Sequence, residues 1–105
     1  PELQQLISKF SPNYVCIQET RLNPNRTFNF RKYNTFRKDR QTDQIASGGV
    51  AILVDNSIYA KQINLNTVFE AIAITTIVPN FYKITICNIY IPPNYNFTCD
   101  QLESL

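Results

Sequence analysis

The sequence contains no histidine among its 105 residues. Histidine is the side chain that most often acts as a general base near neutral pH, and it is the commonest metal ligand. Any catalysis must therefore rely on carboxylates, or on residues outside this sequence. No apolar run reaches the roughly 20 residues that cross a bilayer, so we expect no membrane-spanning helix and no membrane partner. No signal peptide is visible after Pro1.

Close cysteine pairs are also missing. The three cysteines are an odd number, and none belongs to the CxxC pairs that zinc sites and redox motifs use. Cys16 and Cys87 lie within apolar, strand-like runs, where a free cysteine behaves as a small hydrophobic residue. We therefore expect reduced cysteines and an intracellular location, nuclear or cytoplasmic.

The composition contains neither repeats nor low-complexity segments. With 44% hydrophobic and 17% charged residues, it is typical of a soluble globular protein. A chain of 105 residues is long enough for one domain, or for part of one, and for a modest core.

The net charge of +2 is unevenly distributed. Residues 21–40 include seven basic side chains and one acidic side chain, so this stretch carries +6. Four aromatic residues are interleaved with these charges: Phe28, Phe30, Tyr33 and Phe36. Such a mixture suits phosphate binding and base stacking, and a solvated loop with aromatic anchors explains it equally well.

Hydrophobic periodicity predicts an amphipathic helix followed mainly by strands. The helix covers residues 2–10, because its apolar residues recur at helical spacing and a proline follows. Residues 14–17 and 50–54 are apolar at every position, which is typical of strands covered on both faces. The other predicted elements are short strands at 33–38 and 57–63, a hairpin of 69–78 with 82–91, and a helix starting near 98.

Glu19 is the first candidate site residue. It follows the apolar strand at 14–17 directly, and α/β sheets commonly present functional side chains just beyond strand ends. Magnesium prefers oxygen ligands and is typically held by one or two carboxylates, with water and substrate phosphate completing the shell. The alternative is a solvated strand-end residue that forms a weak surface ion pair with Arg21.

Five segments follow one another in the order YVCIQETRL (14–22), YNTFRKDR (33–40), GGVAILV (48–54), FEAIAI (69–74) and ICNIYIPP (86–93). In this order they resemble the exonuclease, endonuclease and phosphatase superfamily, whose members include DNase I-like nucleases. The sequences of these segments are most similar to the endonuclease domain of jockey-type non-LTR retrotransposons, a LINE class. They cover nearly the whole chain.

This resemblance implies roles for individual residues. Glu19 matches the glutamate that binds catalytic magnesium, or manganese in its place, and Tyr90 matches a tyrosine near the scissile phosphate. From the pattern alone, a tyrosine in an apolar strand such as Tyr90 is more often a core residue whose hydroxyl finds a local partner. The family usually has an asparagine where this sequence has Pro93, with Asn94 one position later. Candidate DNA backbone contacts are Arg21, Arg37, Lys38 and Arg40. Gly48 and Gly49 are better explained as a tight entry to the following strand than as a phosphate-binding loop.

The resemblance also implies a fold and a function. The expected fold is α/β, a partial four-layer DNase I-like sandwich with a mixed, mostly antiparallel sheet. Residues 1–105 would form about the amino-terminal half of one domain, truncated at both ends. The family's first-strand asparagine, which would precede Pro1, is absent, and so are its Gly-Asp-x-Asn and Ser-Asp-His motifs, which would follow Leu105. The expected function is magnesium-dependent nicking of DNA that primes a downstream reverse transcriptase domain, and the fragment alone would be inactive. The alternatives are a catalytically dead relic that only binds nucleic acid or protein, and a superfamily member acting on lipid or nucleotide phosphoesters.

Overall fold

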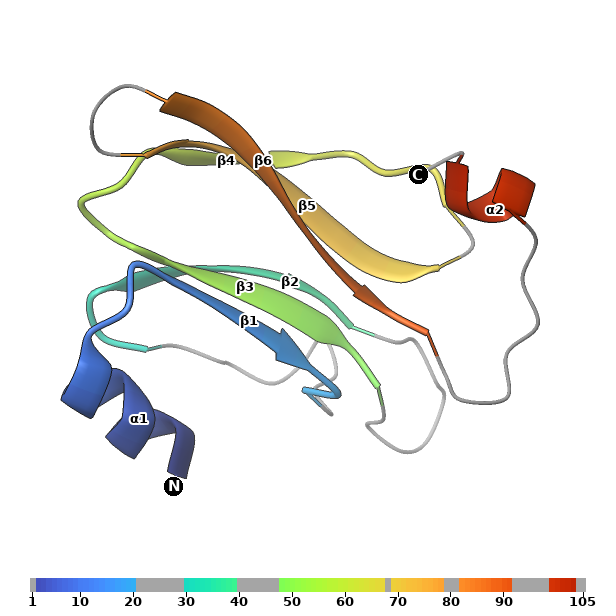
Figure 1. The fold of residues 1–105 in the computed structure, drawn as a ribbon. Helices are drawn as coiled ribbons and strands as arrows, with labels where there is room; N and C mark the ends of the chain where they lie inside the picture. The colour runs from blue at the N-terminus through green and yellow to red at the C-terminus, as the bar shows by residue number, and fades with distance from the viewer. Residues whose placement is uncertain are drawn as a thin grey trace.

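Six strands and two short helices make up the part of the chain that the structure describes (Figure 1). The computed structural model describes residues 2–20, 30–39, 48–67, 69–78, 82–91 and 99–103. The elements are α1 (Glu2–Phe10), β1 (Tyr14–Gln18), β2 (Tyr33–Lys38), β3 (Val50–Asp55), β4 (Ala60–Ile63), β5 (Glu70–Val78), β6 (Tyr82–Tyr90) and α2 (Cys99–Glu103).

The first sheet has the strand order β1-β3-β2, and both pairings are antiparallel. β3 occupies the centre because it is apolar at every position from Val50 to Val54, and these five residues are completely buried. Asp55 then ends the strand. Its carboxylate accepts hydrogen bonds from the Ser57 N–H (2.9 Å) and hydroxyl (2.7 Å), which lower the pKa of Asp55 and close the predicted turn.

The second sheet has the order β4-β5-β6 and is also antiparallel. β5 and β6 pair along their whole length, from Glu70 opposite Tyr90 to Val78 opposite Tyr82, as the predicted hairpin requires. β4 is shorter than expected: it begins at Ala60, since the chain is still turning at 56–58.

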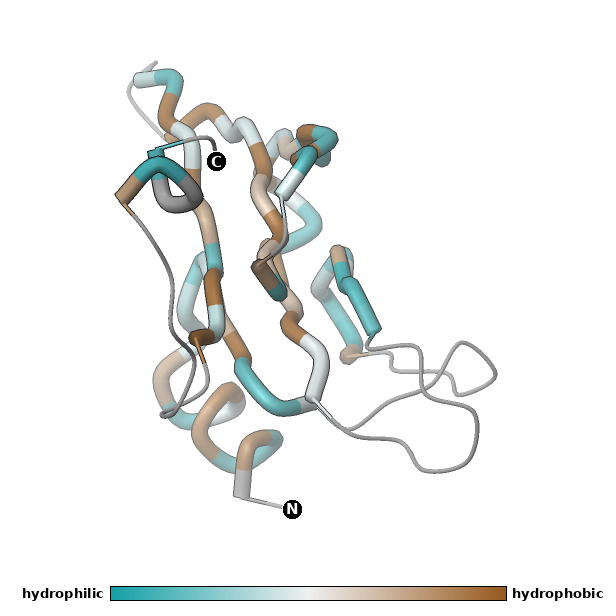
Figure 2. The backbone as a smooth tube through the Cα atoms, turned by 90° about the vertical axis from the view of Figure 1, so that its right-hand side faces the viewer, coloured by the Kyte–Doolittle hydropathy of each residue, from teal (hydrophilic) through white to brown (hydrophobic). Residues whose placement is uncertain are grey.

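The core lies between the two sheets. Ile52 from β3 and Ile74 from β5 are fully buried there, and Phe36 and Ile86 pack against this cluster from the neighbouring strands. The tube in Figure 2 shows that apolar residues are concentrated along the strands. The burial of alternate positions from two facing sheets supplies the main apolar stabilisation of this fold.

The predicted fold class is supported at a coarse level. The sheets are mostly antiparallel, as expected, and the described residues form two packed sheets with two short helices. The covering helical layers of a four-layer sandwich are only partly represented by α1 and α2. No helix in the described part of the chain is long and apolar enough to span a bilayer.

β1 is less buried than its sequence predicts. Cys16 is exposed, as is Cys87 on β6, because both residues lie on strands at sheet edges. Desolvation by the surrounding chain raises the pKa of both thiols, and at Cys16 the nearby Cys87 adds to the shift. Both thiols are therefore protonated near neutral pH and are poor nucleophiles.

Candidate active site

Five strand ends meet at one end of the sandwich, which we call the site end (right in Figure 1). It comprises the carboxyl ends of β1, β2 and β6 and the amino ends of β3 and β5. In the first sheet, Gln18 and Lys38 both pair with Val50. In the second sheet, Glu70 lies opposite Tyr90. The antiparallel register thus gathers side chains that are far apart in the sequence.

Glu19 lies at this end, one residue beyond β1, with an exposed side chain. Its backbone has a φ of 53°, the left-handed conformation that costs a residue with a Cβ about 1 to 2 kcal/mol. The next residue holds this conformation in place, because the Thr20 N–H donates to the Gly49 carbonyl at 3.2 Å. The carboxylate is therefore presented to solvent on a constrained backbone, not buried in the apolar interior.

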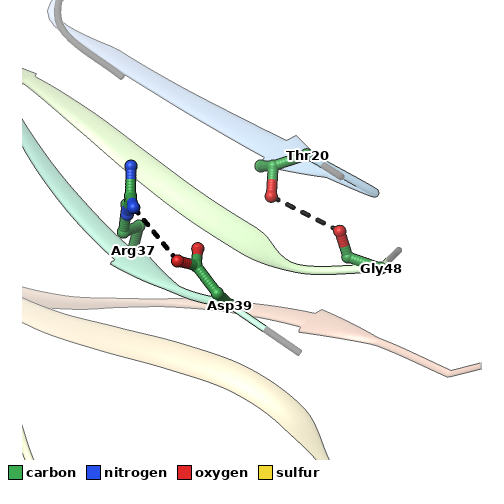
Figure 3. A network of polar contacts seen from close by, with 4 residues as sticks. All are labelled: Thr20, Arg37, Asp39 and Gly48. Atoms are coloured by element: carbon green, nitrogen blue, oxygen red, sulfur yellow. Dashed lines mark hydrogen bonds and ion pairs between the residues drawn. The ribbon is translucent and has the colours of Figure 1, made fainter. Parts of the chain in front are cut away.

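Gly48 and Gly49 form the other side of this junction. Both have positive φ, 64° and 94°, and the Thr20 hydroxyl donates to the Gly48 carbonyl at 3.4 Å (Figure 3). A Cβ on Gly49 would collide with the Thr20 Oγ1 atom. The structural explanation of these glycines, a tight entry to β3, is supported by this geometry.

Substituting Gly49→Ala is expected to lower the free energy of unfolding by about 2 to 4 kcal/mol, since it combines a disfavoured φ with a steric clash. Urea denaturation measures the change. In the double variant with Thr20→Gly, the clash is removed, so part of the loss should return. Equal stability of Gly49→Ala and the parent chain would contradict the described junction.

Asn88 joins the two sheets beneath the site end. Its side-chain amide, in a residue only 5% exposed, donates to the carbonyls of Ile17 and Ala51, both at 2.9 Å. Gln18 adds a second link, since its amide donates to the Ile89 carbonyl at 2.6 Å and lies 3.4 Å from the Asn88 amide oxygen. These contacts fix the end of β1, and hence Glu19, against β6.

Glu70 is a site residue that the sequence analysis missed. Its carboxylate accepts a short hydrogen bond from the Gly49 N–H, across the gap between the sheets. It is partly buried and lies directly opposite Tyr90, which packs against the core cluster. The FEAIAI segment predicts part of a strand and resembles a family segment, but no sequence signal indicates that its acid contacts the Gly-Gly entry to β3.

The predicted phosphate contacts differ in their surroundings. The Arg37 guanidinium forms an ion pair with Asp39 at 3.1 Å, and the Asp39 side chain is only 8% exposed (Figure 3). The other Asp39 carboxylate oxygen is buried and has no hydrogen-bond partner in the described structure. Lys38 is exposed, and its ammonium donates to the Phe69 carbonyl at 3.4 Å. Arg21 and Arg40, like Asn94, lie outside the described residues.

Glu19 presents an exposed carboxylate at this end, and Glu70 supplies a second acid on the facing sheet. A group of three or more acidic, cysteine or histidine side chains suited to a metal does not occur among the residues that the structure describes. One or two carboxylates are enough protein ligands for a magnesium ion when water and phosphate supply the remaining ligands. The donor chemistry at the site end therefore fits a divalent ion held jointly with a phosphate-bearing substrate.

Comparison with known proteins identifies the family. The chain matches the endonuclease/exonuclease/phosphatase family over residues 2–103, which is nearly its whole length. No curated protein and no solved structure matched significantly. This family contains nucleases and phosphatases with a DNase I-like fold. Its members hydrolyse phosphodiester bonds and typically depend on divalent metals. The chain belongs to the endonuclease/exonuclease/phosphatase family.

Proposed function

We propose that this chain is part of a magnesium-dependent DNA endonuclease of a non-LTR retrotransposon. In this proposal it nicks target DNA, and the nick primes a reverse transcriptase encoded downstream in the same polypeptide. Residues 1–105 supply the amino-terminal part of the nuclease domain, and segments outside this range complete the catalytic set. The protein acts inside the cell, where its target DNA lies.

The exposed carboxylate of Glu19 at the site end is the observation that carries this proposal. The left-handed backbone at Glu19 is energetically unfavourable, and strained residues of this kind cluster at functional sites. The Gly48-Gly49 entry, Glu70 and the end of β6 surround the same strand end.

Glu19 would hold the magnesium ion, and manganese could take its place. When bound, the ion would supply positive charge to the scissile phosphate and orient it. Glu70 contributes by fixing Gly49, whose carbonyl in turn holds the Thr20 N–H beside Glu19. Tyr90, opposite Glu70, is proposed to contact the substrate near the scissile phosphate through its hydroxyl.

A supercoiled-plasmid nicking assay tests the proposed activity. The chain alone and the polypeptide extended through its own reading frame are compared with and without magnesium. We expect magnesium-dependent nicks with a free 3′ hydroxyl from the extended polypeptide, and none from the chain alone. Binding of plasmid by the extended polypeptide without any nicking would instead favour the noncatalytic binding module.

Lys38→Ala in the extended polypeptide is expected to weaken DNA binding uniformly across sequences. Lys38 is exposed, and its ammonium would exchange the long hydrogen bond to the Phe69 carbonyl for a contact with one phosphate, so the slope of log affinity against log salt should flatten by about one unit. Fluorescence anisotropy at several salt concentrations measures this slope. Arg37→Ala is the matched comparison: since Asp39 already pairs with Arg37, its effect should fall mainly on stability. An unchanged slope for Lys38→Ala would remove this residue from the interface.

A further inference from the structure

Two strands from different sheets run in the same direction toward the site end. β1 belongs to the first sheet and β6 to the second, and the two strands contact each other (Figure 1). Glu19 directly follows β1, and Tyr90 is the last residue of β6. Among the described residues, no backbone ladder joins these two strands, because each sheet pairs within itself. The spacing of Glu19 and Tyr90 therefore depends on side-chain contacts between the sheets.

The polar contacts between β1 and β6 advance by one residue on each strand. The Asn88 side-chain amide donates to the Ile17 carbonyl at 2.9 Å. One residue further along both strands, the Gln18 side-chain amide donates to the Ile89 carbonyl at 2.6 Å. Both pairs are 71 residues apart in the sequence, so the two strands are aligned in parallel at this point.

Gln18 is adjacent to the candidate residues of both strands. It precedes Glu19, and the carbonyl that it binds belongs to the residue before Tyr90. One more step along both strands therefore leads to Glu19 on β1 and Tyr90 on β6, at the same separation in the sequence. A second contact, 3.4 Å to the Asn88 amide oxygen, orients the Gln18 amide toward β6. A single side chain thus connects the ends of the two strands that carry the candidate residues.

The Gln18 contacts contribute little to folding stability. The side chain is exposed, so water replaces its partners when they separate, and the net stabilisation by such hydrogen bonds is small. Asn88, in contrast, is buried and satisfies two backbone carbonyls. Removing the Gln18 amide should therefore leave the packed sheets intact and change the relative position of the two strand ends.

We propose that Gln18 is a positioning residue for the nuclease reaction, which holds the Glu19 carboxylate in a fixed position relative to the Tyr90 hydroxyl. The assignment rests on the proposed function, in which Glu19 holds the metal ion and Tyr90 contacts the substrate near the scissile phosphate. Reaction rates depend steeply on such alignment, since a displacement of about 1 Å can cost roughly a hundredfold in rate. In this role Gln18 itself contacts neither the metal nor the substrate.

Gln18→Met in the extended polypeptide tests the positioning role. Methionine keeps the length of the side chain and removes the N–H donor. Single-turnover nicking of plasmid is expected to slow roughly tenfold, and not more, because Asn88 still links β1 to β6. Manganese affinity, measured by electron paramagnetic resonance, should equal that of the parent because Glu19 is retained. Equal nicking rates of Gln18→Met and the parent would overturn the proposal.

Gln62→Met is the matched control for this experiment. It makes the same chemical change at an exposed position of β4, in the second sheet and away from β1. Its nicking rate and manganese affinity should equal those of the parent. A loss of nicking as large as that of Gln18→Met would show that the change of side chain, and not its position, slows the reaction.

Combination with Tyr90→Phe separates positioning from general destabilisation. Because Gln18 is proposed to align Glu19 with the Tyr90 hydroxyl, loss of that hydroxyl should slow nicking less in the Gln18→Met polypeptide than in the parent, by roughly threefold or more. Independent effects would instead multiply, since they add in free energy. Losses that multiply would overturn the positioning role.

Hydrogen exchange in the full chain tests the Gln18 contact without any activity. In Gln18→Met, the Thr20 amide and the amides at the end of β6 are expected to exchange roughly two to five times faster, whereas the buried Ile52 amide in β3 should exchange as in the parent. Unchanged exchange at both strand ends would overturn the contact. A parent polypeptide that does not nick plasmid would overturn the proposed function, and the positioning role with it, whatever the exchange result.

Discussion

Glu19→Gln in the extended polypeptide is expected to reduce magnesium-dependent DNA nicking by roughly a hundredfold or more. The amide keeps the size and hydrogen-bonding capacity of the side chain but removes the charge that attracts a divalent ion. Because Glu19 is exposed, the fold should be unaffected. Plasmid nicking measures the activity, and titration with manganese followed by electron paramagnetic resonance measures metal binding separately.

Glu103→Gln is the matched control for this experiment. It makes the same chemical change at an exposed position of α2 and should leave both nicking and manganese binding unchanged. If Glu19→Gln nicks plasmid as fast as the parent polypeptide, Glu19 is not the metal ligand. Loss of nicking with unchanged manganese affinity would likewise contradict a role in holding the metal.

Asn88→Ala is expected to lower the free energy of unfolding by about 2 to 4 kcal/mol. The substitution leaves the carbonyls of Ile17 and Ala51 without the donor that satisfies them, in a site only 5% exposed, and each unmet buried carbonyl costs about 1 to 3 kcal/mol. Urea denaturation measures the stability. Since Asn88 also positions the end of β1, hydrogen exchange at the amides of β1 should accelerate more than exchange in β3.

Gln18→Ala provides the comparison. Gln18 also bonds across the two sheets, but it is exposed, so water can replace its partners and the expected loss is less than about 1 kcal/mol. Equal destabilisation by the two substitutions would show that burial does not decide the strength of this link. A stable Asn88→Ala variant would mean that the Asn88 amide contributes little to holding the two sheets together.

Much of the fold could be predicted from local sequence patterns. The uninterrupted apolar run from Val50 to Val54 indicates a fully buried strand because no polar side chain needs access to water. The hairpin of β5 and β6 follows from two β-branched stretches separated by Pro79-Asn80, although that turn lies outside the described residues. The prediction that β1 is covered on both faces is wrong, because no feature of the local sequence indicates that Cys16 lies on an edge strand.

The candidate site was only partly predictable, because the local sequence does not indicate which strands lie side by side. Glu19 could be identified because a carboxylate directly after a buried strand is a local signal. Glu70 contacts Gly49, which is 21 residues away in the sequence, and Asn88 contacts Ala51, which is 37 residues away. Both contacts cross the gap between the two sheets. Such contacts depend on which strand ends meet, and that arrangement is a property of the packed sheets and not of any single segment.

The backbone conformation at Glu19 also bears on how this chain would change over many generations. A glycine at this position would adopt the same φ at no steric cost, so Glu19→Gly is expected to raise stability slightly, by up to about 1 kcal/mol. Folding alone therefore does not favour the acid. If the proposed nuclease function holds, glutamate at this position is retained for its chemistry and at a small cost in stability.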